Sequence, residues 1–167
     1  MIETIGQVPI GEIAVSSDPN DQFVIYGLGS CVAVCVYDRT KRVGGVLHAL
    51  LPSNPRSDRG GGKPSKFVDQ GVPLLIDAVT ALGGRPRRMS ACLVGGANTI
   101  KTPYLNFNSS LNIGQRNVQA AEAALQAAGL KVSAQATGGT AGRTMKFYLT
   151  DGQITVKMLG QTIQILA

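Results

Sequence analysis

The chain contains a single histidine, His48, which follows Cys31 by seventeen residues. A thiol and an imidazole within reach of each other can form a thiolate–imidazolium pair, the basis of cysteine nucleophilic catalysis. Gly27, Gly29 and Ser30 precede the cysteine. Glycines allow close backbone approach and unusual dihedral angles, so free amides in this segment could face a developing oxyanion. These residue types predict a nucleophilic site with Cys31 and His48 at its centre and Gly29 and Ser30 in support.

The residues between the pair predict an antiparallel hairpin that would bring them together. Residues 32–38 and 43–47 are apolar runs, and the charged segment 39–42 separates them. If the turn is centred on Arg39 and Thr40, residues whose numbers sum to 79 lie opposite each other, as 31 and 48 do. Directly opposed residues share a sheet face, with Cβ atoms about 4.5–5.5 Å apart. A register shifted by two residues keeps the pair diagonal on one face, whereas a shift of one separates it.

Each member of the pair also has a purely structural interpretation. A lone cysteine in an apolar strand is more often a small buried hydrophobic residue than a nucleophile, and Cys35 and Cys92 fit that description. His48 lies within the apolar run 47–51, so it could be a hydrogen-bonded core histidine. The joint spacing favours the catalytic interpretation. An activated Cys31 would then be alkylated well below pH 8.5, the approximate pKa of a free cysteine.

The composition is typical of a well-packed globular protein, with 44% hydrophobic and 16% charged residues. A length of 167 residues suits one domain, which we expect to span residues 1–167. No apolar run is long enough to cross a bilayer, so no membrane insertion is predicted. Three cysteines without a framework pattern favour reduced thiols and a cytoplasmic location. A single histidine makes a zinc site implausible, and we expect no metal and no cofactor.

The net charge of +6 favours an acidic partner. Nucleic acid is disfavoured because the basic residues form no stripe interleaved with aromatics, which are only 5% of the chain. The basic residues gather in two clusters. These are Arg56, Arg59, Lys63 and Lys66 after the histidine, and Arg85, Arg87 and Arg88 further on. The first lies in the polar, glycine- and proline-rich stretch 53–66, which we interpret as a mobile loop that contacts substrate, with a solvated linker as the alternative.

The remaining pattern predicts further strands and two helices. Short strands are expected at residues 10–16, 22–26, 89–94, 130–136, 143–149 and 153–158, and helices at about 67–82 and 112–129. Asn112 with Gln115 forms a capping-box variant at the start of the second helix, and Gly129 ends it. These elements predict an α+β fold, an α/β sandwich in which two main helices flank mixed or antiparallel sheets and the Cys–His site lies on a strand hairpin.

Several segments, in order along nearly the whole chain, resemble the CheD family of chemoreceptor glutamine deamidases. The most specific are Gly27-Leu28-Gly29-Ser30-Cys31-Val32-Ala33-Val34 and Gly45-Val46-Leu47-His48-Ala49-Leu50-Leu51-Pro52. The others are Lys66-Phe67-Val68-Asp69, Val72-Pro73-Leu74-Leu75, Gly95-Gly96-Ala97-Asn98, Ile113-Gly114-Gln115-Arg116-Asn117 and Thr137-Gly138-Gly139. The resemblance implies an α/β sandwich that hydrolyses selected glutamine side chains of methyl-accepting chemotaxis receptors to glutamate, with release of ammonia. It also implies that some members bind a CheC-family phosphatase.

By this resemblance, Cys31 attacks the amide carbon, and His48 activates the thiol and then assists water attack on the thioester. The basic loop residues Arg56, Arg59 and Lys63 would contact the acidic surface of the receptor. One position departs from the family. The family places a threonine six residues before the cysteine, where it helps orient the histidine, and this chain has Ile25 there.

Because Ile25 has no hydrogen-bonding side chain, another group would have to orient His48. A backbone carbonyl or Thr137 could do so. The alternative to an active enzyme is a weak or inactive regulatory module that binds a receptor or a phosphatase. A small nucleic-acid binder is a third hypothesis, which rests on charge alone.

Overall fold

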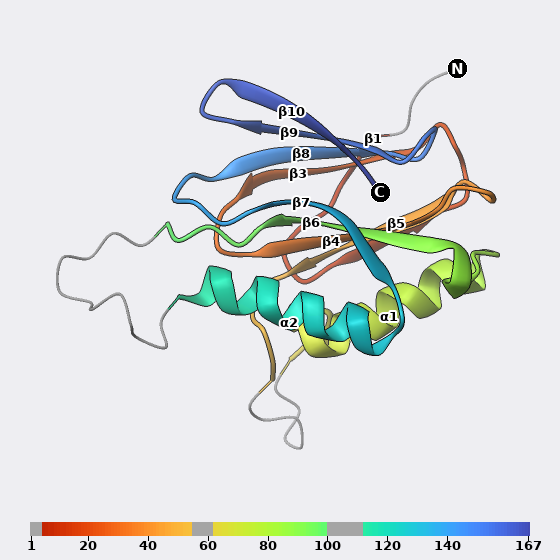
Figure 1. Ribbon diagram of the computed structural model, residues 1–167, viewed down its shortest axis with the longest axis horizontal. Coiled ribbons are helices and arrows are strands. Elements are labelled where there is room, and N and C mark those ends of the chain that lie inside the picture. Colours follow the sequence, from red (N-terminus) through yellow and green to blue (C-terminus); the bar gives the residue numbers. More distant parts are fainter. Residues whose placement is uncertain (1–4, 55–61, 100–111) are drawn as a thin grey trace, which may run out of the picture.

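The computed structural model describes residues 5–54, 62–99 and 112–167, which form two facing β-sheets and a layer of two α-helices (Figure 1). The sheet farther from the helices has the strand order β1-β3-β8-β9-β10. Its strands are β1 (Ile5–Gln7), β3 (Gln22–Leu28), β8 (Arg143–Tyr148), β9 (Gln153–Met158) and β10 (Gln161–Leu166). The sheet next to the helices has the order β2-β5-β4-β6-β7. Its strands are β2 (Ile13–Ser16), β5 (Val43–Ala49), β4 (Val32–Asp38), β6 (Met89–Gly95) and β7 (Lys131–Thr137).

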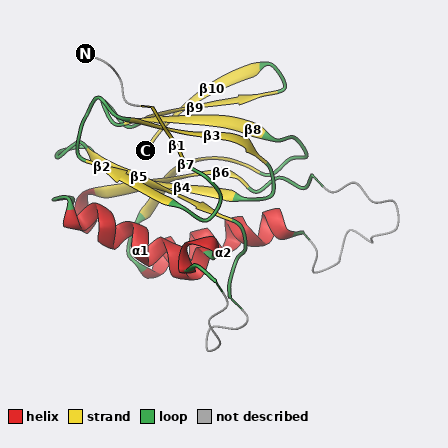
Figure 2. Ribbon diagram, turned by 180° about the vertical axis from the view of Figure 1, so that it is seen from behind, coloured by secondary structure: helices red, strands yellow, loops and turns green. Residues whose placement is uncertain are grey.

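The predicted α+β class is confirmed, and both sheets are mixed. β1 pairs with β3 and β6 with β7 in parallel, while the other pairs are antiparallel. Both helices cover one face of a single sheet, so the layers run sheet, sheet, helices (Figure 2). Strand β10 was not predicted. It is an edge strand with mostly exposed residues, and polar residues interrupt the apolar ones in its sequence QTIQIL.

The hairpin β4–β5 forms as predicted, but its register differs by two residues. Ala33, not Cys31, lies opposite His48. The strands end at Asp38 and begin again at Val43, so residues 39–42 form the turn as expected, but its centre lies between Thr40 and Lys41. The Asp38 carboxylate accepts the backbone N–H of residues 40 and 41, and Arg42 adopts a left-handed conformation with φ of 53°. This local chemistry moves the centre of the turn one residue along the chain.

Two helices pack on the outer face of the β4–β5 sheet. Helix α1 (Val68–Ala81) contains Pro73 in its second turn. Helix α2 (Ile113–Ala127) begins after Asn112, whose side-chain oxygen accepts the backbone N–H of Gln115 at 3.1 Å. That cap confirms the start predicted from the sequence. Short 3₁₀ turns, η1 (Pro64–Lys66) and η2 (Pro86–Arg88), precede α1 and β6.

The buried residues form two cores, one on each face of the helix-side sheet. Alternate residues of β4 and β5 face opposite ways, as strand geometry requires. Val32, Val34 and Leu47 pack against the helices. Ala33, Cys35 and Val46 pack between the two sheets, and Cys31 belongs to the same inter-sheet core. The hairpin is therefore buried on both faces, which limits how far side chains on it can move.

Candidate active site

Cys31 and His48 lie on the same side of the hairpin. Cys31 immediately precedes β4 and belongs to the inter-sheet core together with Ala33, the residue opposite His48. His48 alternates with Leu47 and Ala49, which face the helices, so its imidazole is on the inter-sheet side. The pair is thus diagonal, the outcome of a two-residue register shift. Diagonal neighbours are about 7–8 Å apart, within reach of long side chains.

The imidazole of His48 is held by a backbone group. Its Nδ1 lies 2.9 Å from the carbonyl oxygen of Val8, which can only accept a hydrogen bond. Nδ1 therefore carries the proton and donates, which leaves Nε2 as the basic nitrogen. The main chain of His48 is also anchored, because its carbonyl accepts from Gly11 and its N–H donates to Glu12.

This contact supplies the orienting group that Ile25 lacks. Of the two groups considered from the sequence, the backbone carbonyl holds the histidine. Thr137 uses its hydroxyl to donate to the Gln135 side chain at 3.2 Å. Ile25 instead fills the inter-sheet core, where it is 1% exposed.

Burial moves both pKa values toward the neutral forms of the pair. It raises the pKa of the Cys31 thiol, and a hydrogen bond from the backbone of the same residue only partly offsets this. It also lowers the pKa of His48, against the opposing effect of the Val8 carbonyl. The resting site therefore favours a thiol and a neutral imidazole over the ion pair expected from the sequence. A neutral imidazole is the form that can accept a proton from the thiol.

The segment around the cysteine is fastened by its carbonyl groups. The carbonyl of Gly29 accepts from the Ala97 N–H at 2.9 Å, and that of Cys31 from the Gly96 N–H at 2.8 Å. Within the described part of the chain, the N–H groups of Ser30 and Cys31 donate to no backbone carbonyl. The Cys31 N–H bonds to the thiol of its own residue, so it lies on the thiol side of the segment, where the predicted oxyanion site requires a donor.

A glycine allows the loop after β6 to approach the cysteine closely. A Cβ atom built at Gly95 would lie 2.4 Å from the carbonyl oxygen of Cys31, and φ of this residue is +106°. Any other residue would therefore have to push the loop away and adopt an unfavourable backbone conformation. This contact explains one of the glycines in the motif 95–98.

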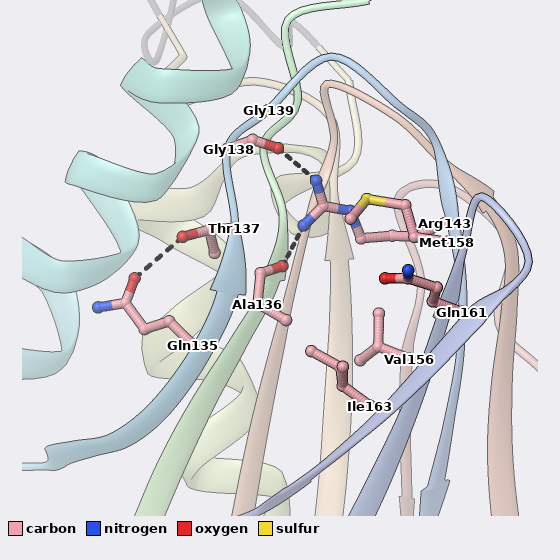
Figure 3. Close-up of a pocket in the computed structure, with 10 residues that line it drawn as sticks. All are labelled: Gln135, Ala136, Thr137, Gly138, Gly139, Arg143, Val156, Met158, Gln161 and Ile163. Carbon is pink, nitrogen blue, oxygen red and sulfur yellow. Dashed lines mark hydrogen bonds between the residues drawn. The ribbon is translucent and has the colours of Figure 1, made fainter.

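The turn after β7 supports this loop from the other side. The N–H of Gly138 donates to the carbonyl of Gly95, and the carbonyl of Gly139 accepts from Asn98. The buried guanidinium of Arg143 donates to the carbonyls of Ala136 and Gly138, as Figure 3 shows. The same close-up shows Thr137 turned toward Gln135 and away from Arg143. The motif 137–139 thus reaches the cysteine segment through backbone contacts, and not through the threonine hydroxyl.

A cavity of about 240 Å³ lies beside this turn, between β7 and the strands β9 and β10 (Figure 3). Arg143, Val156, Met158 and Ile163 are among its lining residues. Neither Cys31 nor His48 lines it. The volume therefore belongs to the edge of the sandwich and not to the pair.

The predicted basic loop is only partly described. Arg56 and Arg59 lie outside the described residues. Lys63 forms a partly exposed ion pair with Glu12, whose carbonyl accepts the N–H of His48. Lys63 is therefore linked to the main chain of His48 through Glu12.

The second basic cluster lies at the far end of β4. There the buried carboxylate of Asp38 accepts from the N–H of Arg85 and from the guanidinium of Arg88. Burial alone would raise the pKa of Asp38, but these hydrogen bonds, together with that from the N–H of Lys41, lower it. A seven-residue strand separates Asp38 from Cys31, a distance of about 20 Å.

Asn117 on α2 contacts the segments on either side of the pair, a contact that was not predicted from the sequence pattern. Its side-chain Nδ2 donates to the carbonyl of Ser30 at 2.9 Å and to that of Leu50 at 3.0 Å. The signal was present in the sequence, because Asn117 precedes Ala121 and Leu125 at helical spacing on the buried face of α2. A polar residue on such a face needs an explanation.

No helix among the described residues is long and apolar enough to cross a membrane. Comparison with solved structures finds a weak likeness to the crystal structure of Bacillus licheniformis hypothetical protein YfiH. The TM-score is 0.42 with 13% identity, over 81% of this chain and 59% of that one. A likeness at this level carries no argument about fold or function.

Sequence comparison is more informative. A family model described as CheD chemotactic sensory transduction matches residues 50–158. A Desulforamulus reducens protein named probable chemoreceptor glutamine deamidase CheD is 41% identical over 160 residues, which cover 96% of this chain and 94% of the relative. A Thermococcus kodakarensis protein with the same name is 41% identical over 151 residues, 90% of this chain and 91% of its own.

The family-model match begins two residues after His48. The alignment with the Desulforamulus protein covers so much of the chain that it also spans residues 31 and 48. The segments around the cysteine and the histidine are therefore part of the likeness. With identity at this level over almost its whole length, the chain belongs to the CheD family.

Proposed function

We propose that this protein hydrolyses the side-chain amide of selected glutamines on chemotaxis receptors to glutamate and ammonia. One observation carries the chemistry. A buried cysteine and the only histidine face the same side of one hairpin, and the Val8 carbonyl holds the imidazole with Nε2 free to act as a base. The substrate class is supported by the relatives, which are named probable chemoreceptor glutamine deamidases.

In the first half of the reaction, Nε2 of His48 takes the proton from Sγ of Cys31 as the sulfur attacks the amide carbon of the glutamine. The S–C bond forms, and the amide oxygen becomes negatively charged. The N–H groups of Ser30 and Cys31 stabilise this charge. The proton then passes from Nε2 to the amide nitrogen, the C–N bond breaks, and ammonia leaves a thioester on Cys31.

In the second half, water attacks the thioester while Nε2 takes one of its protons. The C–S bond breaks, glutamate is left on the receptor, and the sulfur recovers its proton from His48. Each half uses the same nitrogen as a base and then as an acid. The neutral imidazole favoured by burial is the correct starting form for both.

The proposal places the reaction in the cytoplasm, on the helical region of the receptor. A CheC-family phosphatase is a second proposed partner, supported only by the family resemblance, and co-purification with that phosphatase tests it. A weak or inactive regulatory module is the alternative function, because such a protein would keep the same surface without turnover.

Mass spectrometry of the receptor separates the two functions. Receptor peptides incubated with the wild-type protein should show glutamine-to-glutamate conversion at a few sites, and Cys31→Ala should abolish it. Cys35→Ala is the matched control, because Cys35 is a buried cysteine of the same inter-sheet core. It should retain conversion. Conversion that survives in Cys31→Ala, or that is absent from the wild type, would overturn the enzymatic proposal.

A further inference from the structure

Asn117 joins the two segments that carry the proposed catalytic pair. Its Nδ2 donates to the carbonyl of Ser30, the residue before the cysteine, and to the carbonyl of Leu50, two residues after the histidine. The side chain is fully buried on α2. This helix lies beneath the helix-side sheet (Figure 1). A single amide group thus spans from the nucleophile segment to the end of β5.

The orientation of this amide is fixed by its partners. Carbonyl oxygens only accept hydrogen bonds, so the atom that faces both of them is the NH₂ group. The other atom, Oδ1, is buried and accepts no hydrogen bond within the described residues. A buried acceptor without a partner is unfavourable. The next two residues on this face of the helix, Ala121 and Leu125, are apolar. Helix packing alone therefore gives no reason for an asparagine here.

The hydrogen bond to Ser30 also sets the direction of the next N–H group. The carbonyl of Ser30 and the N–H of Cys31 belong to one trans peptide unit, in which they point in opposite directions. Because the carbonyl points to α2, the N–H points away from α2, toward the inter-sheet side. The thiol of Cys31 lies on that side and receives a backbone hydrogen bond from its own residue.

We propose that Asn117 is a positioning residue, which aims the Cys31 N–H at the oxyanion and holds the cysteine segment in register with the strand that bears His48. The inference rests on the proposed deamidation. Asn117 does not touch the reacting atoms and acts through the peptide of Ser30 and through Leu50. Its loss should therefore weaken stabilisation of the transition state while substrate binding remains.

Steady-state kinetics of ammonia release from the receptor test this role. Asn117→Ala should lower kcat by about 10²-fold, the order expected for a misplaced oxyanion donor, with little change in KM. Leu125→Ala is the control, because it removes a fully buried side chain from the same face of α2, two turns away. It should lower the melting temperature and leave kcat unchanged. If Asn117→Ala fails to fold, Asn117→Ser keeps one donor and should give an intermediate kcat.

Alkylation of Cys31 by iodoacetamide, resolved by peptide mass spectrometry, tests the same inference without a receptor. His48→Ala should slow the reaction, and Asn117→Ala should slow it comparably. The double variant should be no slower than His48→Ala alone, because both residues act on one pair. Additive effects, or an Asn117→Ala variant that loses only thermal stability, would overturn the inference.

The kinetic and alkylation experiments also distinguish a failure of this inference from a failure of the proposed function. If the wild type converts no receptor glutamine but the alkylation rates are coupled, deamidation is wrong and the positioning role stands. If the wild type converts glutamine and Asn117→Ala has unchanged kcat and alkylation rate, deamidation stands and the positioning role is wrong.

Discussion

At the scale of single residues, the site depends on how burial sets the protonation of Cys31 and His48. Both lie in the inter-sheet region, where water is largely excluded, and both pKa values move toward the uncharged forms. Proton transfer must then accompany attack by the sulfur instead of preceding it. The Val8 carbonyl contributes by fixing which imidazole nitrogen takes part.

The pH dependence of the reaction follows from the raised pKa of Cys31 and the lowered pKa of His48. Because the pKa of His48 is lowered from 6.5, the imidazole stays neutral as the pH falls through that value. The acidic limb of kcat/KM should therefore lie below pH 6.5, and alkylation of Cys31 should reach half its maximal rate above the usual cysteine pKa of about 8.5. A pH profile of each rate checks this. Half-maximal alkylation well below pH 8.5 would indicate the ion pair instead, and an acidic limb above 6.5 would contradict the lowered pKa of His48.

Replacing Ile25 by threonine tests whether the residue typical of the family is needed. Ile25→Thr should destabilise the protein by about 2 kcal/mol, because it places a hydroxyl in an apolar core. It should not raise kcat, since Nδ1 of His48 already donates to Val8. Ile25→Val is the size control and should cost about 1 kcal/mol. Urea unfolding and kcat measure both effects. If kcat of Ile25→Thr exceeds that of Ile25→Val, the absence of a threonine at position 25 limits the rate of the natural protein.

At the scale of elements, two loop motifs and helix α2 meet around the cysteine segment and hold it in place. The motif 95–98 contacts Gly29 and Cys31, the motif 137–139 contacts the motif 95–98, and α2 contacts Ser30. The glycines of these motifs allow backbones to approach without a side chain between them. Motifs far apart in the sequence therefore converge on one short segment.

The contact between Gly95 and the cysteine segment leaves the least space for a side chain in this arrangement. Gly95→Ala would place a Cβ atom 2.4 Å from the Cys31 carbonyl oxygen, while Gly83→Ala meets no atom within 4 Å. Both glycines have nearly the same φ, +106° and +101°, so Gly83→Ala isolates the backbone cost of about 1–2 kcal/mol. Urea unfolding should show a larger loss for Gly95→Ala, and only this variant should lose kcat. Equal losses with retained activity would contradict the arrangement.

The sequence predicted which helices and strands form better than it predicted the register of the β4–β5 hairpin. Two apolar runs around a charged segment predicted the hairpin, the caps predicted α2, and the spacing predicted that Cys31 and His48 share one face. The register itself depended on the turn, where the Asp38 carboxylate and the left-handed Arg42 shift the centre by one residue. A side chain that bonds to the backbone of a turn leaves little trace in hydrophobic periodicity.

The orienting group of the histidine could not be predicted in detail for a different reason. The carbonyl of Val8 has no side-chain signature, because every residue carries a carbonyl and only the fold selects one. Asn117 could have been found, since it is a polar residue at a buried helix position. Its partners on two other segments depend on the packing of α2 and not on local sequence.

At the scale of the whole molecule, the two basic clusters lie at different distances from the Cys31–His48 pair. Lys63 lies beside Glu12 and hence near the strand that bears His48. The cluster of Arg85 to Arg88 lies at the opposite end of β4. We expect a receptor segment bound at Cys31 to lie closer to Lys63 than to the Arg85–Arg88 cluster.

This distribution predicts which charges attract an acidic receptor. Lys63→Gln should raise KM and reduce its dependence on salt, because exposed charges near the site steer association and are screened over about 10 Å at 0.1 M salt. Arg87→Gln removes the same charge at the far end of β4 and should leave KM unchanged. Neither variant should alter kcat. Steady-state kinetics at two salt concentrations check this, and equal effects of the two variants would argue against local steering.

The central claim is that Cys31 forms a covalent thioester with a receptor glutamine while His48 transfers the protons. The most direct test is intact mass spectrometry of the protein quenched in acid during turnover of a receptor peptide. We predict an adduct on Cys31 with the mass of the peptide less ammonia, which hydroxylamine releases as the hydroxamate, and which Cys31→Ala does not form. Steady conversion of glutamine to glutamate by the Cys31→Ala variant, with no adduct on the wild type, would contradict the account.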